Sequence, residues 1–135
     1  MTRFEAKVKA RAQDISDLTE RVGGFLHDGG VDTHATHHVG MILDELLTNL
    51  ATHGGAADAD AAVRISIEKD RVFVEISDNG PPFDPRSTPD PDVAAPLEER
   101  GIGGLGLFLM RKLASDIRYD RSDARNHTSF AVSRR

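Results

Sequence analysis

The chain has 135 residues, of which 39% are hydrophobic, with a net charge of −5 and no cysteine. We therefore predict one domain over residues 1–135, without disulfides or cysteine-based zinc sites and without the basic surface that non-specific nucleic-acid binding needs. No run approaches the roughly 18 apolar residues of a membrane span and no basic-then-apolar signal opens the chain, so we expect a cytoplasmic protein that binds neither membrane nor nucleic acid.

The first half of the chain predicts one strand and two helices. Residues 4–10 alternate apolar and charged side chains, the period of a half-buried strand. Apolar residues then recur at helical spacing after Asp14, which we predict to be the N-cap, until a glycine pair stops the helix. A second helix, capped by Asp32 or Thr33, is predicted to run to the glycines at 54–55.

The second half predicts two hairpins around one helix. Residues 63–67 and 72–76 alternate again and indicate an antiparallel pair, residues 105–113 have the apolar density of a buried helix, and 117–119 with 128–132 indicate a closing hairpin. This order predicts an α+β fold, a two-layer α/β sandwich with a mixed, mostly antiparallel sheet that helices cover on one face. A parallel doubly wound fold is disfavoured because helices do not separate every pair of strands.

A loop at about 81–103 interrupts this pattern. All six prolines of the chain lie between Pro81 and Pro96, and proline removes amide donors and fixes φ. Loops of this length are usually functional or disordered. Glycines follow at the loop's end, where backbone amides can approach a ligand closely, and the next helix would direct its N-terminal amides at an anion such as phosphate. We expect a ligand-binding lid; a flexible linker is the alternative.

Three polar residues are candidates for chemistry. Glu45 and Asn49 lie one turn apart at the edge of the second helix's apolar face, where a carboxylate can deprotonate a hydroxyl and an amide oxygen can ligate Mg²⁺. Asp78 ends a strand before an Asn-Gly turn, and its carboxylate can accept a hydrogen bond from the exocyclic amine of adenine while disfavouring guanine. The alternatives are solvated helix residues and an ordinary turn-forming aspartate.

Four histidines, His34, His37, His38 and His53, raise the question of a metal site. His34 and His38 lie one turn apart, which supplies half of a zinc site, but no further ligand completes it. We do not expect these histidines to bind metal.

Three ordered stretches together resemble one family. Glu45–Gly54 (ELLTNLATHG) resembles the N-box of the gyrase, histidine-kinase and MutL-type ATP-binding superfamily (Bergerat fold, or GHKL), Asp78–Pro85 (DNGPPFDP) its G1 box, and Gly101–Leu109 (GIGGLGLFL) its G2 box. The last two stretches, with the short chain, are most similar to bacterial anti-sigma-factor serine/threonine kinases. The resemblance spans essentially the whole chain.

The resemblance implies ATP and Mg²⁺ as ligands and assigns roles to residues. Asn49 would hold the Mg²⁺ that bridges the phosphates, Asp78 would bind adenine with Gly80 keeping the turn close, and Glu45 would be the general base for a partner's serine hydroxyl. Leu50 stands where many relatives have alanine, a bulkier fit beside the metal. The remaining implied nucleotide contacts are Gly103, Gly104, Leu105 and Gly106 around the phosphates and Arg100 at the γ-phosphate. Thr128 would lie beside the Asp78 carboxylate that binds adenine.

The resemblance also implies a function. It indicates an ATP-dependent serine/threonine protein kinase that acts as a homodimer, sequesters a sigma factor, and phosphorylates a serine on a STAS-type anti-anti-sigma protein. A nucleotide-dependent binding module without phosphotransfer is one alternative. The catalytic half of a split histidine kinase is another, although these residues show no upstream helical pair or phosphoacceptor-histidine segment.

Overall fold

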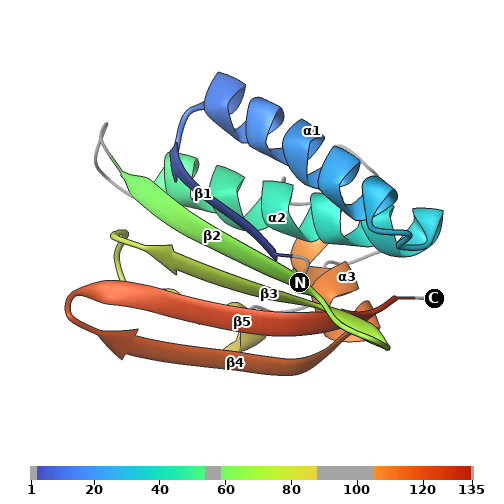
Figure 1. The fold of residues 1–135 in the computed structure, drawn as a ribbon. Coiled ribbons are helices and arrows are strands. Elements are labelled where there is room, and N and C mark those ends of the chain that lie inside the picture. Colours follow the sequence, from blue (N-terminus) through green and yellow to red (C-terminus); the bar gives the residue numbers. More distant parts are fainter. Residues whose placement is uncertain (1–2, 54–58, 88–104, 135) are drawn as a thin grey trace, which may run out of the picture.

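The computed structural model describes residues 3–53, 59–87 and 105–134, which form five strands, three α-helices and one 3-10 turn. Figure 1 shows these elements in two layers, with the sheet on one side and the helices on the other. In chain order the elements are β1 (Arg3–Lys9), α1 (Ala12–Asp28), α2 (Thr33–His53), β2 (Asp60–Ile67), β3 (Arg71–Asp78), η1 (Pro85–Ser87), α3 (Leu105–Leu113), β4 (Ala114–Ser122) and β5 (Arg125–Ser133).

The strands lie in the order β1-β2-β3-β5-β4. Every pairing among them is antiparallel, so the predicted α+β sandwich is confirmed and the described sheet is antiparallel throughout rather than mixed. Hairpins explain two of the four pairings, since short turns connect β2 to β3 and β4 to β5. Asp123 and Ala124 form the second turn with φ of 54° and 59°, the left-handed backbone of the tight hairpin turns that match strand twist.

Helices α1 and α2 lie side by side over one face of the sheet, and α3 packs against α2 (Figure 1). Strand β3 shows how the sequence period produces this layering: Val72, Val74 and Ile76 are buried under the helices, and the residues between them point to the other face. Asp78 continues the buried register, so its carboxylate points to the helix-covered side. The core also contains Ile15, Leu18, Val22, Leu26, Val39, Ile42, Leu43, Leu47, Val63, Ile65, Leu107, Met110 and Phe130.

The helix starts differ in part from the prediction. The prediction of Asp14 as N-cap was wrong: α1 begins at Ala12, and Arg11 stands at the N-cap without a side-chain cap bond. Asp14 lies in the first turn instead, where a negative charge is favourable to the helix dipole. For α2 the cap is Asp32, whose Oδ1 accepts a hydrogen bond from the His34 amide at 2.8 Å.

The predicted lid lies mostly outside the described residues, which stop at 87 and resume at 105. Its first part is held in place: Pro85–Ser87 form a 3-10 turn, in which the Ser87 amide and hydroxyl both donate to the Asp84 carbonyl at 3.1 and 2.8 Å. Within the described ranges, no helix is long and apolar enough to cross a membrane.

Candidate functional site

Helix α2 places Glu45 and Asn49 at the boundary between core and solvent. Both are partly buried, whereas Asp44 and Thr48 beside them are exposed and Leu47 is buried. This is the arrangement that the helical period predicts, since residues four apart lie on one line of the helix surface.

Glu45 is in direct contact with the first turn of α3. Gly106 lies so close that a Cβ atom there would be 2.4 Å from the Glu45 Cβ and 2.8 Å from its Cγ. The Gly106 amide also donates a hydrogen bond to the Glu45 carboxylate. Glu45 Oε2 is buried and has no hydrogen-bond partner in the part of the chain that the structure describes. The fold therefore brings the N-box-like stretch and the end of the G2-like stretch together.

The environment of Glu45 changes its acidity. Burial raises the pKa of the Glu45 carboxyl, the hydrogen bond from the Gly106 amide lowers it, and the nearby Asp44 charge raises it. The net result is a pKa above the usual value for glutamate. A carboxylate whose pKa moves towards neutral pH is a better proton acceptor, which is what a general base requires.

Asp78 is held by one oxygen of its carboxylate. Oδ1 accepts hydrogen bonds from the Gly80 amide at 2.9 Å and from Asn126 Nδ2 at 3.0 Å. Among the described residues Oδ2 has no partner. The buried Gly80 is fixed in turn, because its carbonyl accepts from Arg121 Nη1 at 2.7 Å. Hydrogen bonds within the turn after β3 therefore fix the position of Asp78.

Thr128 lies on the same side of the sheet but not opposite Asp78. It is buried on β5, paired with Ile76 and Tyr119, two residues along the strand from the Asp78–Asn126 pair. The sequence analysis did not single out Asn126. A buried asparagine opposite a G1-like aspartate becomes visible only when β3 and β5 are known to pair.

The other predicted residues divide into two groups. Leu105 begins α3, next to Gly106. Arg100, Gly103 and Gly104 lie outside the described residues. The structure thus brings Glu45 to Gly106 and mounts Asp78 on the helix-covered side, whereas the contribution of the lid residues stays a prediction.

The groups present fit a magnesium nucleotide. Among the described residues Asp78 Oδ2 has no partner and is available to an adenine amine. The Glu45 side chain lies against Gly106 in the N-terminal turn of α3, a position that favours phosphate. The described ranges contain no group of three or more His, Cys, Asp or Glu residues that would hold a metal by themselves. Mg²⁺ bound with a nucleotide does not need one, since phosphates and water supply most of its ligands.

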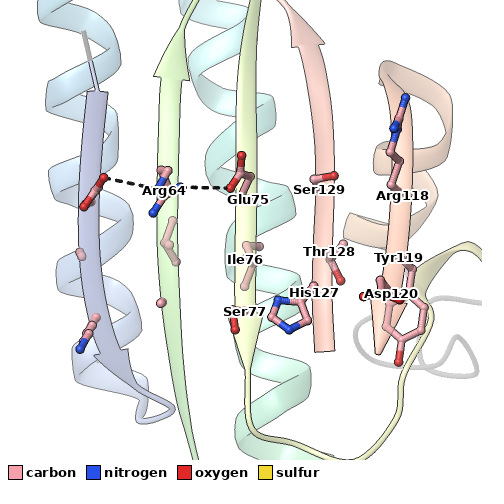
Figure 2. Close-up of a pocket in the computed structure, with 15 residues that line it drawn as sticks. Arg64, Glu75, Ile76, Ser77, Arg118, Tyr119, Asp120, His127, Thr128 and Ser129 are labelled. Carbon is pink, nitrogen blue, oxygen red and sulfur yellow. Dashed lines mark ion pairs between the residues drawn. The ribbon is translucent and has the colours of Figure 1, made fainter. Parts of the chain in front are cut away.

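A separate hollow of about 860 Å³ lies on the helix-free face of the sheet. Figure 2 shows the side chains that line it, among them Arg64, Glu75, Ser77 and His127. Arg64 joins Glu75 and Glu5 across the strands at 3.7 and 3.3 Å. Because these side chains alternate with those that face the helices, the hollow is distinct from the site of Glu45 and Asp78.

The fold and this arrangement define a histidine kinase-like ATPase domain, and the chain belongs to that family, whose sequence profile matches residues 8–132. Among individual proteins, it is 35% identical over 92 residues to the serine/threonine-protein kinase BtrW of Bordetella bronchiseptica, a match that covers 67% of this chain and 65% of BtrW. It is 31% identical over 118 residues to the serine-protein kinase RsbW of Listeria monocytogenes, covering 83% of this chain and 75% of that protein.

Solved structures share the fold at low identity. The RsbU and RsbW domains of Rv1364c from Mycobacterium tuberculosis superpose with a TM-score of 0.67 at 15% identity, over 100% of this chain and 34% of that one. The mycobacterial sensor histidine kinase MprB superposes with a TM-score of 0.51 at 18% identity, over 96% of this chain and 99% of that one.

Proposed function

We propose that this protein is an ATP-binding serine/threonine protein kinase that works as an anti-sigma-factor-type partner switch. Its substrate would be a serine on a STAS-type anti-anti-sigma protein. Family membership and the names of the relatives support ATP and protein phosphorylation. The observation that carries the proposal is the contact of Glu45 with Gly106, on the side of the sheet to which Asp78 points.

The nucleotide would lie between β3 and the helices. Asp78 Oδ2 would accept a hydrogen bond from the adenine amine while Oδ1 stays on Gly80 and Asn126. The phosphates would lie at the N-terminal turn of α3, where unpaired amides and the helix dipole favour negative charge. In this proposal the phosphate contacts are Arg100, Gly103, Gly104, Leu105 and Gly106, and Thr128 lies beside the base.

Asn49 is the proposed protein ligand of Mg²⁺. Its side-chain oxygen lies one helical turn from Glu45 and adds no charge, so the carboxylate next to it remains available as a base. When bound, Mg²⁺ would offset the negative charge of the phosphates. Leu50, the neighbour of Asn49, is buried and packs in the core.

Glu45 would act on the substrate serine. Its carboxylate would accept the hydroxyl proton as the serine oxygen attacks the γ-phosphorus, the bond to the β,γ-bridging oxygen breaks, and ADP leaves. The raised pKa of Glu45 suits this step. Before nucleotide binds, the Gly106 amide holds the same carboxylate in place.

The partner assignments are part of the proposal. A STAS-type protein would be the substrate, a sigma factor the sequestered partner, and the kinase a cytoplasmic homodimer. The relatives named RsbW and BtrW support a serine kinase, and these finer assignments follow from the family resemblance.

Phosphate transfer tests the proposal directly. The purified protein is incubated with Mg²⁺, γ-labelled ATP and a candidate STAS-type protein, and the labelled residue is identified by mass spectrometry. Label on a serine is expected. ATP binding without transfer would support the binding module instead, and label on a histidine of another chain would support the split histidine kinase.

A further inference from the structure

Asn126 has the most complete hydrogen bonding of any side chain near Asp78 in the described structure. It is only 3% exposed. Its Nδ2 donates to Asp78 Oδ1 at 3.0 Å and to the Pro81 carbonyl at 2.8 Å. Its Oδ1 accepts from the Tyr119 hydroxyl at 2.5 Å and from the Phe83 amide at 3.3 Å. The amide therefore uses both of its donor protons and both of its acceptor positions.

These partners allow one orientation of the amide. If Asn126 were turned over, its carbonyl oxygen would face the Asp78 carboxylate and the Pro81 carbonyl, which are both acceptors. Its NH₂ group would face the Phe83 amide, which is a donor. Each buried mismatch is costly, because the group loses water without gaining a partner. The Asn126 NH₂ is thereby fixed towards Asp78.

The strand register explains why this residue can reach both Asp78 and the loop. Asn126 lies directly opposite Asp78 in the β3–β5 pairing. Tyr119 reaches the same amide from β4. Pro81 and Phe83 follow Asp78 closely in the chain, so a single amide joins the carboxylate to the backbone that leaves the sheet.

We propose that Asn126 is a positioning residue for Asp78, an inference that rests on the proposed nucleotide site. By holding Oδ1, Asn126 directs Oδ2 at the adenine ring, which makes recognition of the adenine amine geometrically selective. The same amide also bonds to the backbone of Pro81 and Phe83, so it holds Asp78 and the beginning of the 81–87 segment in one geometry.

Replacing this amide by a carboxylate gives a distinctive test. In Asn126→Asp the donor facing Asp78 Oδ1 becomes a second carboxylate, about 3 Å away. Two carboxylates so close cannot both be charged without cost, and the pKa of one of them rises. At high pH they repel and Asp78 is displaced. At lower pH a shared proton restores a donor to Asp78.

Calorimetry at two pH values measures the effect with the full chain. For Asn126→Asp we expect ATP affinity to fall by about tenfold or more near pH 8 and to recover largely near pH 5.5, when the pair holds a proton. The preference for ATP over GTP should fall and recover in parallel. Tyr119→Phe, which removes one bond that orients the amide, should weaken ATP binding by about two- to tenfold at both pH values.

A matched control lies on the same strand. Phe130 is fully buried on β5 and its side chain does not take part in the Asp78 network. Phe130→Leu lowers stability without touching Asp78, so it should leave ATP affinity and purine preference unchanged in the folded protein. A purely structural role of Asn126 would make Asn126→Asp behave like this control.

The outcomes separate the two proposals. Failure of the wild-type protein to bind ATP would refute the proposed function. Tight binding by wild type together with unchanged affinity and purine preference in Asn126→Asp at both pH values would overturn the positioning role alone. If Asn126→Asp does not fold, Tyr119→Phe decides, and wild-type affinity and purine preference in that variant would overturn the role.

Discussion

Gly106 and Glu45 touch across the α2–α3 interface so closely that a side chain at 106 cannot be added without movement. The added Cβ would lie 2.4 Å from the Glu45 Cβ, an atom fixed to the backbone of α2. The glycine of the G2-like stretch is therefore explained by the fold itself, before any ligand is considered. The contact also places the proposed base against the proposed phosphate-binding turn.

Gly106→Ala should destabilise the protein. The helices must separate to admit the methyl group, and overpacking of this kind costs about 1–3 kcal/mol. Urea unfolding measures the loss. The matched control is Gly24→Ala on α1, where nothing lies within 4 Å of the added Cβ. That variant should gain about 0.5–1 kcal/mol from helix propensity. Equal effects at the two positions would contradict the close contact.

Glu45→Gln should change how stability depends on pH. Because the pKa of Glu45 is raised in the folded state, the folded protein binds more protons than the unfolded chain between the ordinary glutamate pKa of 4.5 and the raised pKa. The free energy of unfolding of the wild type therefore falls as pH rises through this window. Glutamine does not titrate, so the variant should gain stability relative to wild type between acid and neutral pH. Parallel curves from urea unfolding at several pH values would contradict the raised pKa.

The same variant should separate binding from catalysis. Glu45→Gln keeps the shape of the side chain and removes its basicity, so Mg-ATP affinity should stay close to wild type while phosphate transfer falls by about 10²–10⁴-fold. Initial rates of label transfer and calorimetry measure the two quantities. Glu20→Gln makes the same chemical change at an exposed position of α1 and should transfer at the wild-type rate. Full transfer by Glu45→Gln would mean that another group is the base.

Asp78→Asn should weaken ATP binding. Oδ1 can remain a carbonyl that accepts from Gly80 and Asn126, which leaves the new NH₂ facing the adenine amine, donor against donor. Losing a hydrogen bond to a buried charged group costs about 1.5–3 kcal/mol, roughly ten- to hundredfold in affinity. Calorimetry provides the measurement, with the exposed Asp70→Asn as control. Unchanged affinity in folded Asp78→Asn would refute the adenine contact.

Asn49→Ala should remove the dependence of ATP binding on Mg²⁺. In the wild type, chelating Mg²⁺ should weaken ATP binding, because the metal joins the phosphates to the side-chain oxygen of Asn49. The variant should already bind weakly and respond little to the chelator. Thr48→Ala, at the exposed neighbouring position, should respond like wild type. A full magnesium effect in Asn49→Ala would place the metal ligand elsewhere.

Most helices and strands, and the chemistry of their residues, are predictable from the sequence alone, because both are read from neighbouring positions. Alternation over 63–67 and 72–76 gave β2 and β3, and helical spacing placed Glu45 and Asn49 together at the edge of the core face of α2. Local sequence does not locate the helix starts. Asp14 and Asp32 are both good capping residues, and local sequence does not show that α1 begins one turn earlier at Ala12.

Contacts between residues far apart in the chain follow from the tertiary structure and are not predictable from local sequence. β5 pairs with β4, its neighbour in the chain, and also with β3. The second pairing places Asn126 opposite Asp78. The packing of α3 on α2 likewise brings Gly106 to Glu45. Such contacts depend on how whole strands and helices bury their apolar faces together, and a shift of one residue in the β3–β5 register would turn Asn126 to the opposite face of the sheet.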